Sequence, residues 1–423
     1  MSRKLPALQS AVMLAAFAMA MLVLATTAAA QTEKILHNFN NNGKDGADPA
    51  AGLIFDSTGN LYGTTFAGGT NDAGTVYELQ PKAGGGWSNK VLHSFIANGS
   101  SAYDPYYAGV TMDTAGNLYG TTLYGGIYGA GTVFELVRQA NGTYLERVLH
   151  NFGNGKDGSE PYAGVILDAE GNVYGTTFTG GLSGLGMVFE LTPSTGEGWK
   201  EKALYSFTRT DGSGGGTPEA ALVFDSAGNL YGTTSGRLGG GVGAVFELKP
   251  TTSGPWTLDV LHAFLNSETD GGIPLSGLVF DGSGNLYGTT SEGGSVYGIG
   301  AVFELSPTAG GSWTETQLHD FTGGSDGCYP QYGAVVLDGQ GNVYGTTTEC
   351  GITGGGVVYE LSPSGATWTE KILYTFVDHT KDGVGPQGTL VRDSSGNLYG
   401  TTQYGGTGQN NGIGAGTVFE ITP

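Results

Sequence analysis

Tyrosine side chains gather in two short stretches of the sequence, and their spacing could build a binding surface. The first stretch is SAYDPYY at residues 101–107, and the second is LYGGIYG at residues 123–129. A tyrosine offers a flat apolar ring and a hydroxyl group, which together suit a sugar ring or a protein interface. Ordinary surface tyrosines are the alternative. With one tyrosine farther along the chain, the candidate ligand-binding residues are Tyr103, Tyr106, Tyr107, Tyr124, Tyr128 and Tyr162.

Carboxyl groups near these tyrosines suggest a second chemistry, the cleavage of glycosidic bonds. Asp104, Asp157 and Glu160 are the nearest candidates. Glycosidases hold two carboxyl groups about 5 to 9.5 Å apart, and sequence alone does not fix such a distance. The chain has no HExxH and no Walker A motif, and its GxGxxG at residues 153–158 opens no predicted helix. We therefore assign no catalytic residue.

The composition excludes several classes of function. Of the 423 residues, 79 are glycine, 39% are hydrophobic and only 13% are charged. The apolar share is large enough to build a core, so simple disorder is excluded. The formal net charge of -21 has the wrong sign for a surface that neutralises phosphate groups. We expect no nucleic-acid partner.

The first thirty residues have the pattern of a secretory signal peptide. Arg3 and Lys4 precede an apolar run from Ala11 to Ala25, and small residues fill positions 26–30. A retained membrane anchor is the alternative, because the run is nearly long enough to span a bilayer. Cleavage before Gln31 would leave residues 31–423 as a secreted protein, extracellular or periplasmic, with no membrane insertion.

A repeated motif divides the rest of the chain into equal units. GN(L/V)YGTT begins at Gly59, Gly116, Gly171, Gly228, Gly284, Gly341 and Gly396, with spacings of 55 to 57 residues. Each unit contains four short β-branched and aromatic runs separated by Gly, Pro, Asp and Asn. This pattern predicts an all-β, seven-bladed β-propeller with four antiparallel strands per blade. A β-solenoid is the alternative.

The turns predict the order of strands in a blade. In the first unit we expect 51–56 innermost, then 60–65, 75–79 and 90–95 outermost, because Asp-x-x-Gly-Asn between the first two runs is typical of a hairpin turn. The chain starts with an outermost-type run, 33–39, and ends with a third-type run, 416–421. Pairing of these two runs would close the ring and remove exposed strand edges.

The repeat resembles the Gloeo-Verruco (GloVer) tandem repeat of secreted bacterial proteins. The resemblance rests on GN(L/V)YGTT, the following GG, and G(T/A/M/V)V(F/Y)EL, and it covers essentially all of residues 31–423. It implies an exported bacterial protein. The family has no established catalytic residues that could be assigned to this chain.

Polar residues that recur in every unit are expected to be structural, since one active site needs its groups only once. His379 lies outside the histidine pattern. One repeated position holds His37, His93, His150, His262 and His319, with Tyr205 and Tyr374 in the other two units. Exchange of His for Tyr indicates a hydrogen-bonded ring rather than a ligand or base. Asp-Gly recurs in the interblade loops at Asp45, Asp157, Asp211, Asp270, Asp326 and Asp382. Turn formation is favoured for these pairs, and cation binding is the alternative.

The two cysteines of the chain are expected to form a disulfide. Cys328 and Cys350 lie eleven residues on either side of Gly339, in the hairpin turn of the sixth unit. Antiparallel pairing would bring them opposite each other, and an exported protein favours the disulfide over two free thiols.

These observations favour a secreted, non-enzymatic propeller that binds an extracellular polysaccharide or a protein through its interblade-loop face. We expect a monomer with no cofactor and no metal ion. The alternatives are a polysaccharide-cleaving enzyme, lyase or glycosidase, with loop carboxylates near the central channel, and a purely structural envelope protein. Propellers host all of these roles, so the fold does not choose among them.

Overall fold

The computed structural model describes residues 32–423 except 100, 195, 197, 253–254, 295–297, 378–381, 409 and 411. The described residues form 37 β-strands and no helix. In this part of the chain no helix is long and apolar enough to cross a membrane. The predicted signal peptide, residues 1–30, and His379 lie outside the described residues.

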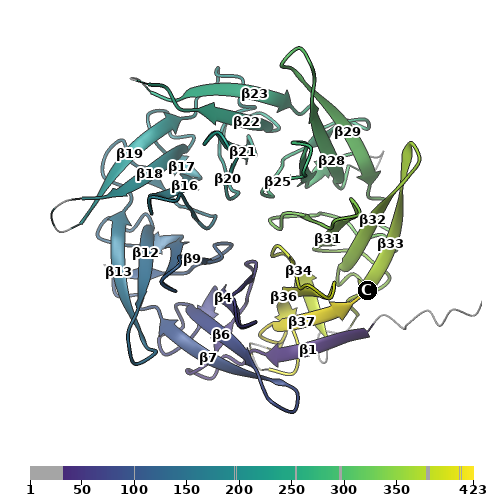
Figure 1. The fold of residues 1–423 in the computed structure, drawn as a ribbon. Helices are drawn as coiled ribbons and strands as arrows, with labels where there is room; N and C mark the ends of the chain where they lie inside the picture. The colour runs from purple at the N-terminus through teal and green to yellow at the C-terminus, as the bar shows by residue number, and fades with distance from the viewer. Residues whose placement is uncertain are drawn as a thin grey trace, which may run out of the picture.

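Seven antiparallel sheets surround a central axis and form a β-propeller (Figure 1). From the centre outwards, the first three blades consist of β3 (Ile54–Phe55), β4 (Leu61–Thr65), β6 (Thr75–Pro81) and β7 (Trp87–Ser94); β9 (Thr111–Met112), β10 (Leu118–Thr122), β12 (Thr132–Arg138) and β13 (Tyr144–Asn151); and β15 (Ile166–Leu167), β16 (Val173–Thr177), β18 (Met187–Pro193) and β19 (Trp199–Ser206). The predicted strand order is confirmed.

The remaining blades follow the same plan. Blades 4 to 6 consist of β20 (Val223–Phe224), β21 (Leu230–Thr234), β22 (Ala244–Lys249) and β23 (Thr257–Ala263); β25 (Val279–Phe280), β26 (Leu286–Thr290), β28 (Ala301–Pro307) and β29 (Trp313–Asp320); and β30 (Val336–Leu337), β31 (Val343–Thr347), β32 (Val357–Ser364) and β33 (Thr367–Thr375). Blade 7 consists of β35 (Val391–Arg392), β36 (Leu398–Gly405), β37 (Thr417–Thr422) and β1 (Thr32–Asn38), with β34 (Gly383–Pro386) also paired to β36.

Short two-stranded ribbons tie the interblade loops to the ends of the second strands. They pair β2 (Gly46–Ala47) with β5 (Ala67–Gly68), β8 (Ala102–Tyr103) with β11 (Tyr124–Gly125), β14 (Gly158–Ser159) with β17 (Thr179–Gly180), and β24 (Gly271–Gly272) with β27 (Glu292–Gly293). In blade 6 a bridge between Cys328 and Glu349 takes this place. The Cys328–Cys350 disulfide lies here, with the two Cα atoms 5.4 Å apart, as expected.

The turn between the two innermost strands fixes their register. In blade 1, Asp56 Oδ1 accepts hydrogen bonds from the backbone N–H groups of Thr58 and Asn60 at 2.8 and 2.9 Å. Gly59 has a φ of 87°, which glycine adopts without steric cost. The Asp–Asn contact recurs in the other six blades. Asp-x-x-Gly-Asn is therefore a turn, as the sequence indicates.

The core lies between neighbouring blades, where aromatic rings of one blade meet those of the next. The Phe95 and Phe134 rings are 5.2 Å apart, and the Phe152 and Phe189 rings 5.1 Å. The glycine of LYGTT makes room for these rings, because a Cβ atom on Gly120 would lie 2.6 Å from the Phe134 ring. Repetition of the motif thus repeats the same packing around the circle.

The chain ends close the ring. β1 pairs antiparallel with β37, with Glu33 opposite Ile421 and Ile35 opposite Phe419 (Figure 1). The Thr401 Oγ1 atom donates a hydrogen bond to the Ala51 carbonyl at 2.9 Å, which links blade 7 to blade 1. The predicted closure is confirmed.

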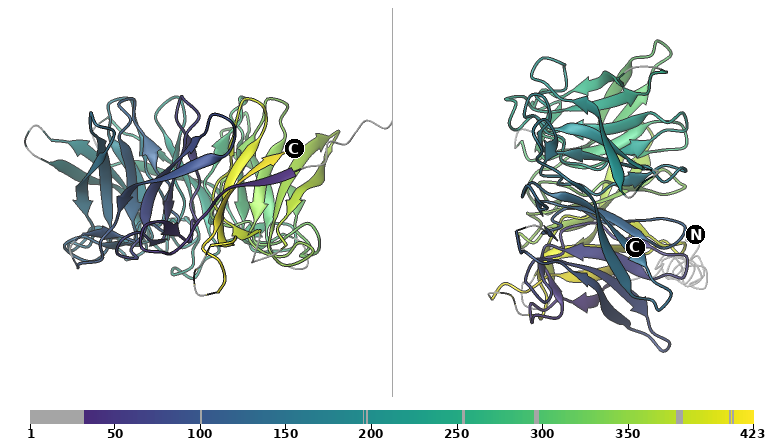
Figure 2. Two further views of the ribbon diagram at one scale, coloured as in Figure 1. Left: turned by 90° about the horizontal axis from the view of Figure 1, so that it is seen from below. Right: turned by 90° about the vertical axis from the view of Figure 1, so that its left-hand side faces the viewer.

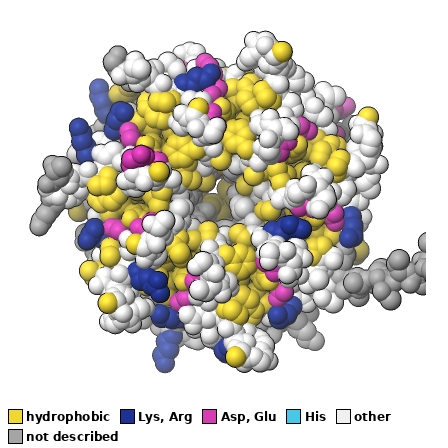
Figure 3. All heavy atoms as spheres, viewed as in Figure 1, with side chains coloured by type: hydrophobic (Ala, Val, Ile, Leu, Met, Phe, Trp, Pro, Cys, Tyr) yellow, Lys and Arg dark blue, Asp and Glu magenta, His cyan; other side chains and the backbone are white. Residues whose placement is uncertain are grey.

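The two faces of the propeller carry different loops. The tight hairpins within each blade lie on one face, and the interblade loops lie on the other (Figure 2). Figure 3 shows the hairpin face, where hydrophobic side chains gather around the central hollow and Lys and Arg lie mostly toward the rim. The tyrosine-bearing loops belong to the opposite face.

Candidate functional site at the channel mouth

A narrow cavity of about 270 Å³ follows the propeller axis and has walls from all seven blades. The innermost segments contribute small residues: Gly52, Gly109, Gly164, Ala221, Gly277, Ala334 and Thr389. Packing here is close, because a Cβ atom on Gly164 would lie 2.6 Å from the Gly109 carbonyl oxygen. Larger side chains line the cavity at its interblade-loop end, and they are Tyr107, Glu219, Tyr332 and Gln387. We call this end the channel mouth.

The loops around the mouth have an unusual backbone. The residue before each loop proline has a positive φ, between 52° and 60° at Asp48, Asp104, Glu160, Thr217, Ile273 and Tyr329, and 68° at Gly385. Non-glycine residues hold this conformation only where the surroundings enforce it. Hydrogen bonds do so here: the N–H of Asp104 donates to the Ala73 carbonyl, and its carbonyl accepts from Leu123 N–H. Hydrogen bonds therefore hold the backbone of the loops around the mouth in one conformation.

Two of the seven loops contain one extra residue at the mouth. The first core residue of the inner strand, Leu53, comes four residues after Pro49 in blade 1, but Val110 comes five residues after Pro105 in blade 2. Blade 6 has the same insertion, between Pro330 and Val335. The longer loops are those that carry Tyr107 and Tyr332.

The tyrosines of the two longer loops meet across the mouth. The Tyr107 and Tyr332 rings stack with centroids 3.6 Å apart and planes inclined by 11°. Tyr106 lies 3.9 Å from Tyr107, and Tyr162 lies 6.3 Å from it. Burial raises the pKa of Tyr107 and Tyr332 above the usual range and that of Tyr162 to about 12. These hydroxyl groups stay protonated at neutral pH.

Polar groups lie beside the stack. Glu219 has a side chain that is 1% exposed. It accepts a hydrogen bond from Ser235 at 2.6 Å and forms an ion pair with Arg237 at 3.4 Å. Burial raises the pKa of Glu219 despite these partners. The Gln387 Oε1 atom is buried and has no hydrogen-bond partner among the residues that the structure describes. The mouth thus combines aromatic surface, a buried carboxylate paired with an exposed arginine, and an acceptor without a partner among the described residues.

The six predicted tyrosines occupy three places. Tyr106, Tyr107 and Tyr162 lie at the mouth, where Tyr106 also packs on Phe66. The Tyr103 and Tyr124 rings pair at 6.1 Å on the β8–β11 ribbon. Tyr128 lies apart and lines an outer crevice.

The predicted carboxylates are also separated. Asp104 and Glu160 precede loop prolines, and burial raises the pKa of Asp104 to about 6, with Asp72 adding to the shift. The Glu160 carboxylate accepts a hydrogen bond from Thr179 at 3.4 Å. Asp157 lies in the outer crevice instead, where it pairs with His150. The three carboxylates do not form one group.

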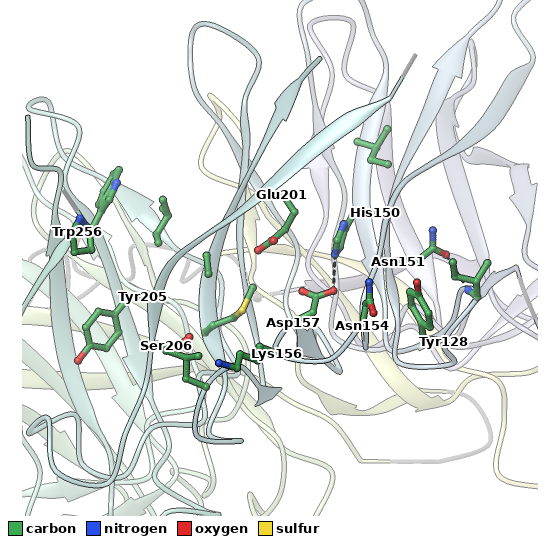
Figure 4. Close-up of a pocket in the computed structure, with 17 residues that line it drawn as sticks. Tyr128, His150, Asn151, Asn154, Lys156, Asp157, Glu201, Tyr205, Ser206 and Trp256 are labelled. Carbon is green, nitrogen blue, oxygen red and sulfur yellow. Dashed lines mark hydrogen bonds and ion pairs between the residues drawn. The ribbon is translucent and has the colours of Figure 1, made fainter. Parts of the chain in front are cut away.

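The outer crevice lies along the outer strands β13 and β19 and has a volume of about 870 Å³ (Figure 4). His150 Nε2 and Asp157 Oδ2 are 2.9 Å apart at its centre, with Tyr128 on one side. Glu201 comes from the next blade, and Trp256 lies farther along. The His150–Asp157 contact recurs elsewhere, so it does not distinguish this crevice as a site.

The same contact repeats around the propeller in what we call the junction clusters. Six of them join the His or Tyr of an outermost strand, the aspartate of the following loop, and a residue of the next outermost strand. In the seventh, Ser101 replaces the aspartate and His93 lies 3.4 Å from Glu146 of the next outermost strand. His37–Asp45 and His262–Asp270 are 3.0 Å apart, and Tyr205–Asp211 and Tyr374–Asp382 are hydrogen-bonded at 3.1 and 3.0 Å. The predicted hydrogen-bonded ring is confirmed at these positions.

One pentapeptide has the spacing of a catalytic motif. Residues 323–327, Gly-Gly-Ser-Asp-Gly, match the G-x-S-x-G of the nucleophile elbow, which needs a strand, a sharp turn and a helix. Here the segment lies in the loop after β29, Ser325 is exposed, and no described residue forms a helix. The motif is therefore not a nucleophile elbow.

Sequence reasoning missed Tyr332, Glu219, Arg237 and Gln387. Tyr332 had a signal in the sequence, since its loop shares the one-residue insertion of the Tyr107 loop. Glu219 and Gln387 each directly follow a loop proline, where other blades have Ala50 or Leu275.

Solved structures with a similar fold share little sequence with this chain. PorZ, a surface component of the type IX secretion system of Porphyromonas gingivalis, has 17% identity and a TM-score of 0.52 over 88% of this chain and 46% of its own. A protein of unknown function from Dyadobacter fermentans has 13% identity and a TM-score of 0.46, over 93% of this chain and 100% of its own. A Thermus thermophilus protein described as a putative oxidoreductase (glucose dehydrogenase) has 14% identity and a TM-score of 0.45, over 93% of this chain and 100% of its own. These likenesses concern the fold alone.

The repeated sequence shows to which family the chain belongs. A comparison with curated proteins gave no match. The family model of the Gloeobacter/Verrucomicrobia repeat matches at residues 21–246, 116–334 and 217–423, which together span the propeller. The chain belongs to the Gloeobacter/Verrucomicrobia repeat family.

Proposed function

We propose that this protein is an exported, non-enzymatic propeller that binds an extracellular polysaccharide at the channel mouth. The observation that carries the proposal is the stacked pair of Tyr107 and Tyr332, built from two insertions that the other blades lack. Aromatic faces with a few fixed polar groups are the usual surroundings of a bound sugar or other small ligand. The Glu219–Arg237 pair and the Gln387 acceptor supply such groups.

Export is supported by the disulfide, because disulfides persist in oxidising compartments outside the cytosol. PorZ, which shares the fold, is described as a bacterial surface component. A net charge of -21 also favours a neutral or cationic partner over an anionic one.

The test is retention of the purified protein on a panel of insoluble bacterial and plant polysaccharides, with released oligosaccharides measured in the same samples. The variant Tyr107→Ala/Tyr332→Ala removes the stack, and Tyr128→Ala is the matched control because it removes a tyrosine outside the mouth. We expect retention that falls at least about tenfold in the first variant, the scale of losing one hot-spot residue, and that stays unchanged in the second.

Other outcomes would contradict the proposal. Retention that survives loss of the stack would remove the mouth as the binding site. Released oligosaccharides would favour the polysaccharide-cleaving enzyme, and Asp104, with its pKa raised to about 6, would be the first carboxylate to examine. No retention on any polysaccharide would leave a protein-binding or structural role.

A further inference from the structure

One junction cluster brings a histidine and two carboxylates close together. It joins His319 of β29, Asp326 of the following loop and Glu370 of β33, so it spans blades 5 and 6. The His319 Nε2 atom is 3.7 Å from Asp326 Oδ2 and 3.5 Å from Glu370 Oε1. In three other clusters the corresponding His–Asp distance is 2.9 to 3.0 Å. His319 is thus farther from its aspartate than the histidines of those three clusters, and it lies between two carboxylates.

The atoms that face one another in this cluster are unsatisfied. His319 Nε2 and Glu370 Oε1 are both buried, and neither has a hydrogen-bond partner among the described residues. The same holds for His93 Nε2 and Glu146 Oε1, but no aspartate completes that cluster. A buried polar atom without a partner destabilises the folded state, and a charged one does so more strongly. A ligand that bonds to both atoms would remove this destabilisation.

The separations suit a metal ion. Three donor atoms, one from each side chain, lie within 4.8 Å of one another. Zinc bonds of about 2.0 to 2.2 Å in tetrahedral geometry place two ligand atoms roughly 3.3 to 3.5 Å apart. One imidazole and two carboxylates form a donor set that zinc accepts, and a divalent cation would neutralise the two acids.

The surroundings hold the aspartate in position. Asp326 accepts hydrogen bonds from the Thr322 N–H at 2.7 Å and from the Thr322 hydroxyl at 2.8 Å. Two residues after Asp326, the disulfide from Cys328 to Cys350 anchors the loop to blade 6. Hydrogen bonds behind a ligand orient it toward the metal. The chain has only these two cysteines, so its one disulfide supports the loop of this cluster.

We propose that His319, Asp326 and Glu370 bind one divalent transition-metal ion, with zinc as the best match and water in the remaining positions. The site links two blades at the rim of the propeller, away from the channel mouth. It is independent of the proposed polysaccharide binding. It also gives one of the recurring loop aspartates a role beyond the turn.

The test is a zinc titration of the tag-free protein after dialysis against a chelator. Isothermal titration calorimetry measures the binding. His319→Tyr is the informative variant, because the repeat itself has Tyr205 and Tyr374 at this position and the fold accepts tyrosine there. His262→Tyr makes the same change in a cluster whose histidine is hydrogen-bonded, and it is the matched control. Glu370→Gln is a second variant that keeps the shape of the side chain.

We expect one zinc ion per chain, unchanged in His262→Tyr. In His319→Tyr and Glu370→Gln we expect affinity reduced by at least about a hundredfold, because a direct ligand costs more than the 10- to 100-fold loss seen for its supporting residues. Absence of saturable binding would overturn the proposal, as would binding that both variants retain. A loss in His262→Tyr equal to that in His319→Tyr would also overturn it, since the site would then not be specific to this cluster.

Discussion

The channel mouth and the junction clusters both include residues of the interblade loops. The junction residues mostly follow the repeat, whereas the mouth residues depart from it. At the junctions the same hydrogen-bonded pair returns from blade to blade, as in His150–Asp157 and His262–Asp270. At the mouth the residue after the loop proline is of five different types in the seven blades: Ala50, Tyr106, Tyr162, Glu219, Leu275, Gln331 and Gln387. Two loops there are also longer by one residue.

This difference separates stability from function. A contact repeated around the ring stabilises several equivalent interfaces, so it serves the ring as a whole. A group that occurs once serves a purpose that the ring does not share. The junctions should therefore govern unfolding and the mouth should govern binding. Among the described residues, the His319 cluster is the junction where a histidine and two carboxylates meet.

The largest effect is expected from a change in the repeated packing. In Gly175→Val the new side chain would start 2.6 Å from the buried Phe189 ring. We expect a loss of more than about 4 kcal/mol of unfolding free energy, or no folded protein, because the core does not yield to overpacking. Gly282→Val is the control, since nothing lies within 4 Å of its Cβ position. Urea denaturation of both variants checks the prediction, and equal losses would contradict it.

The second effect concerns the disulfide. Cys328→Ser/Cys350→Ser opens a loop with a sequence separation of 22 residues, and we expect a loss of about 3 kcal/mol. Denaturation with and without a reducing agent measures it. Reduced native protein should match the double variant. A disulfide without effect on stability would show that blade 6 does not depend on it.

Much of the fold was readable from the sequence, because each blade carries its own local signals. Asp56 and Gly59 define a turn through contacts four residues apart, and LYGTT places glycine where a neighbouring ring needs space. Cys328 and Cys350 were predicted for the same reason, since one hairpin brings them together. Repetition then determined the number of blades.

The site was only partly predictable, because its contacts cross the ring. Tyr107 meets Tyr332 from a blade on the other side of the channel, and no local pattern reports that distance. Tyr128 is near Tyr124 in the chain, but its ring lies in the outer crevice. Glu370 joins His319 only because β33 follows β29 around the circle.

The third prediction is a pH dependence that originates in the junctions. Glu33 of β1 and Glu315 of β29 belong to two junction clusters, those of Asp382 and Asp270. Burial raises the pKa of both glutamates from 4.5 to about 7. Between those values the folded protein binds more protons than the unfolded chain, so unfolding free energy falls as pH rises from about 4.5 to 7. Urea denaturation in a chelating buffer at several pH values measures this. Glu315→Gln should make the fall shallower. A rise in stability across the window would contradict the prediction.

The smallest effect on stability is expected at the mouth. Tyr332→Ala removes one stacked ring, and aromatic pairs contribute about 0.5 to 1.5 kcal/mol. We expect unfolding free energy to fall by about 1 kcal/mol with the propeller intact. Thermal unfolding followed by circular dichroism measures it. A loss as large as that of the disulfide variant would make Tyr332 a structural residue and weaken the contrast between the two regions.

The most direct test restores the repeat at the mouth. Deleting Tyr107 and Tyr332 together returns both loops to the four-position spacing of blade 1, and binding to the retaining polysaccharide is then compared with that of the parent protein. The account predicts a folded propeller that no longer binds. A folded deletion protein that still binds, or one that cannot fold, would contradict the claim that function lies where the repeat is broken.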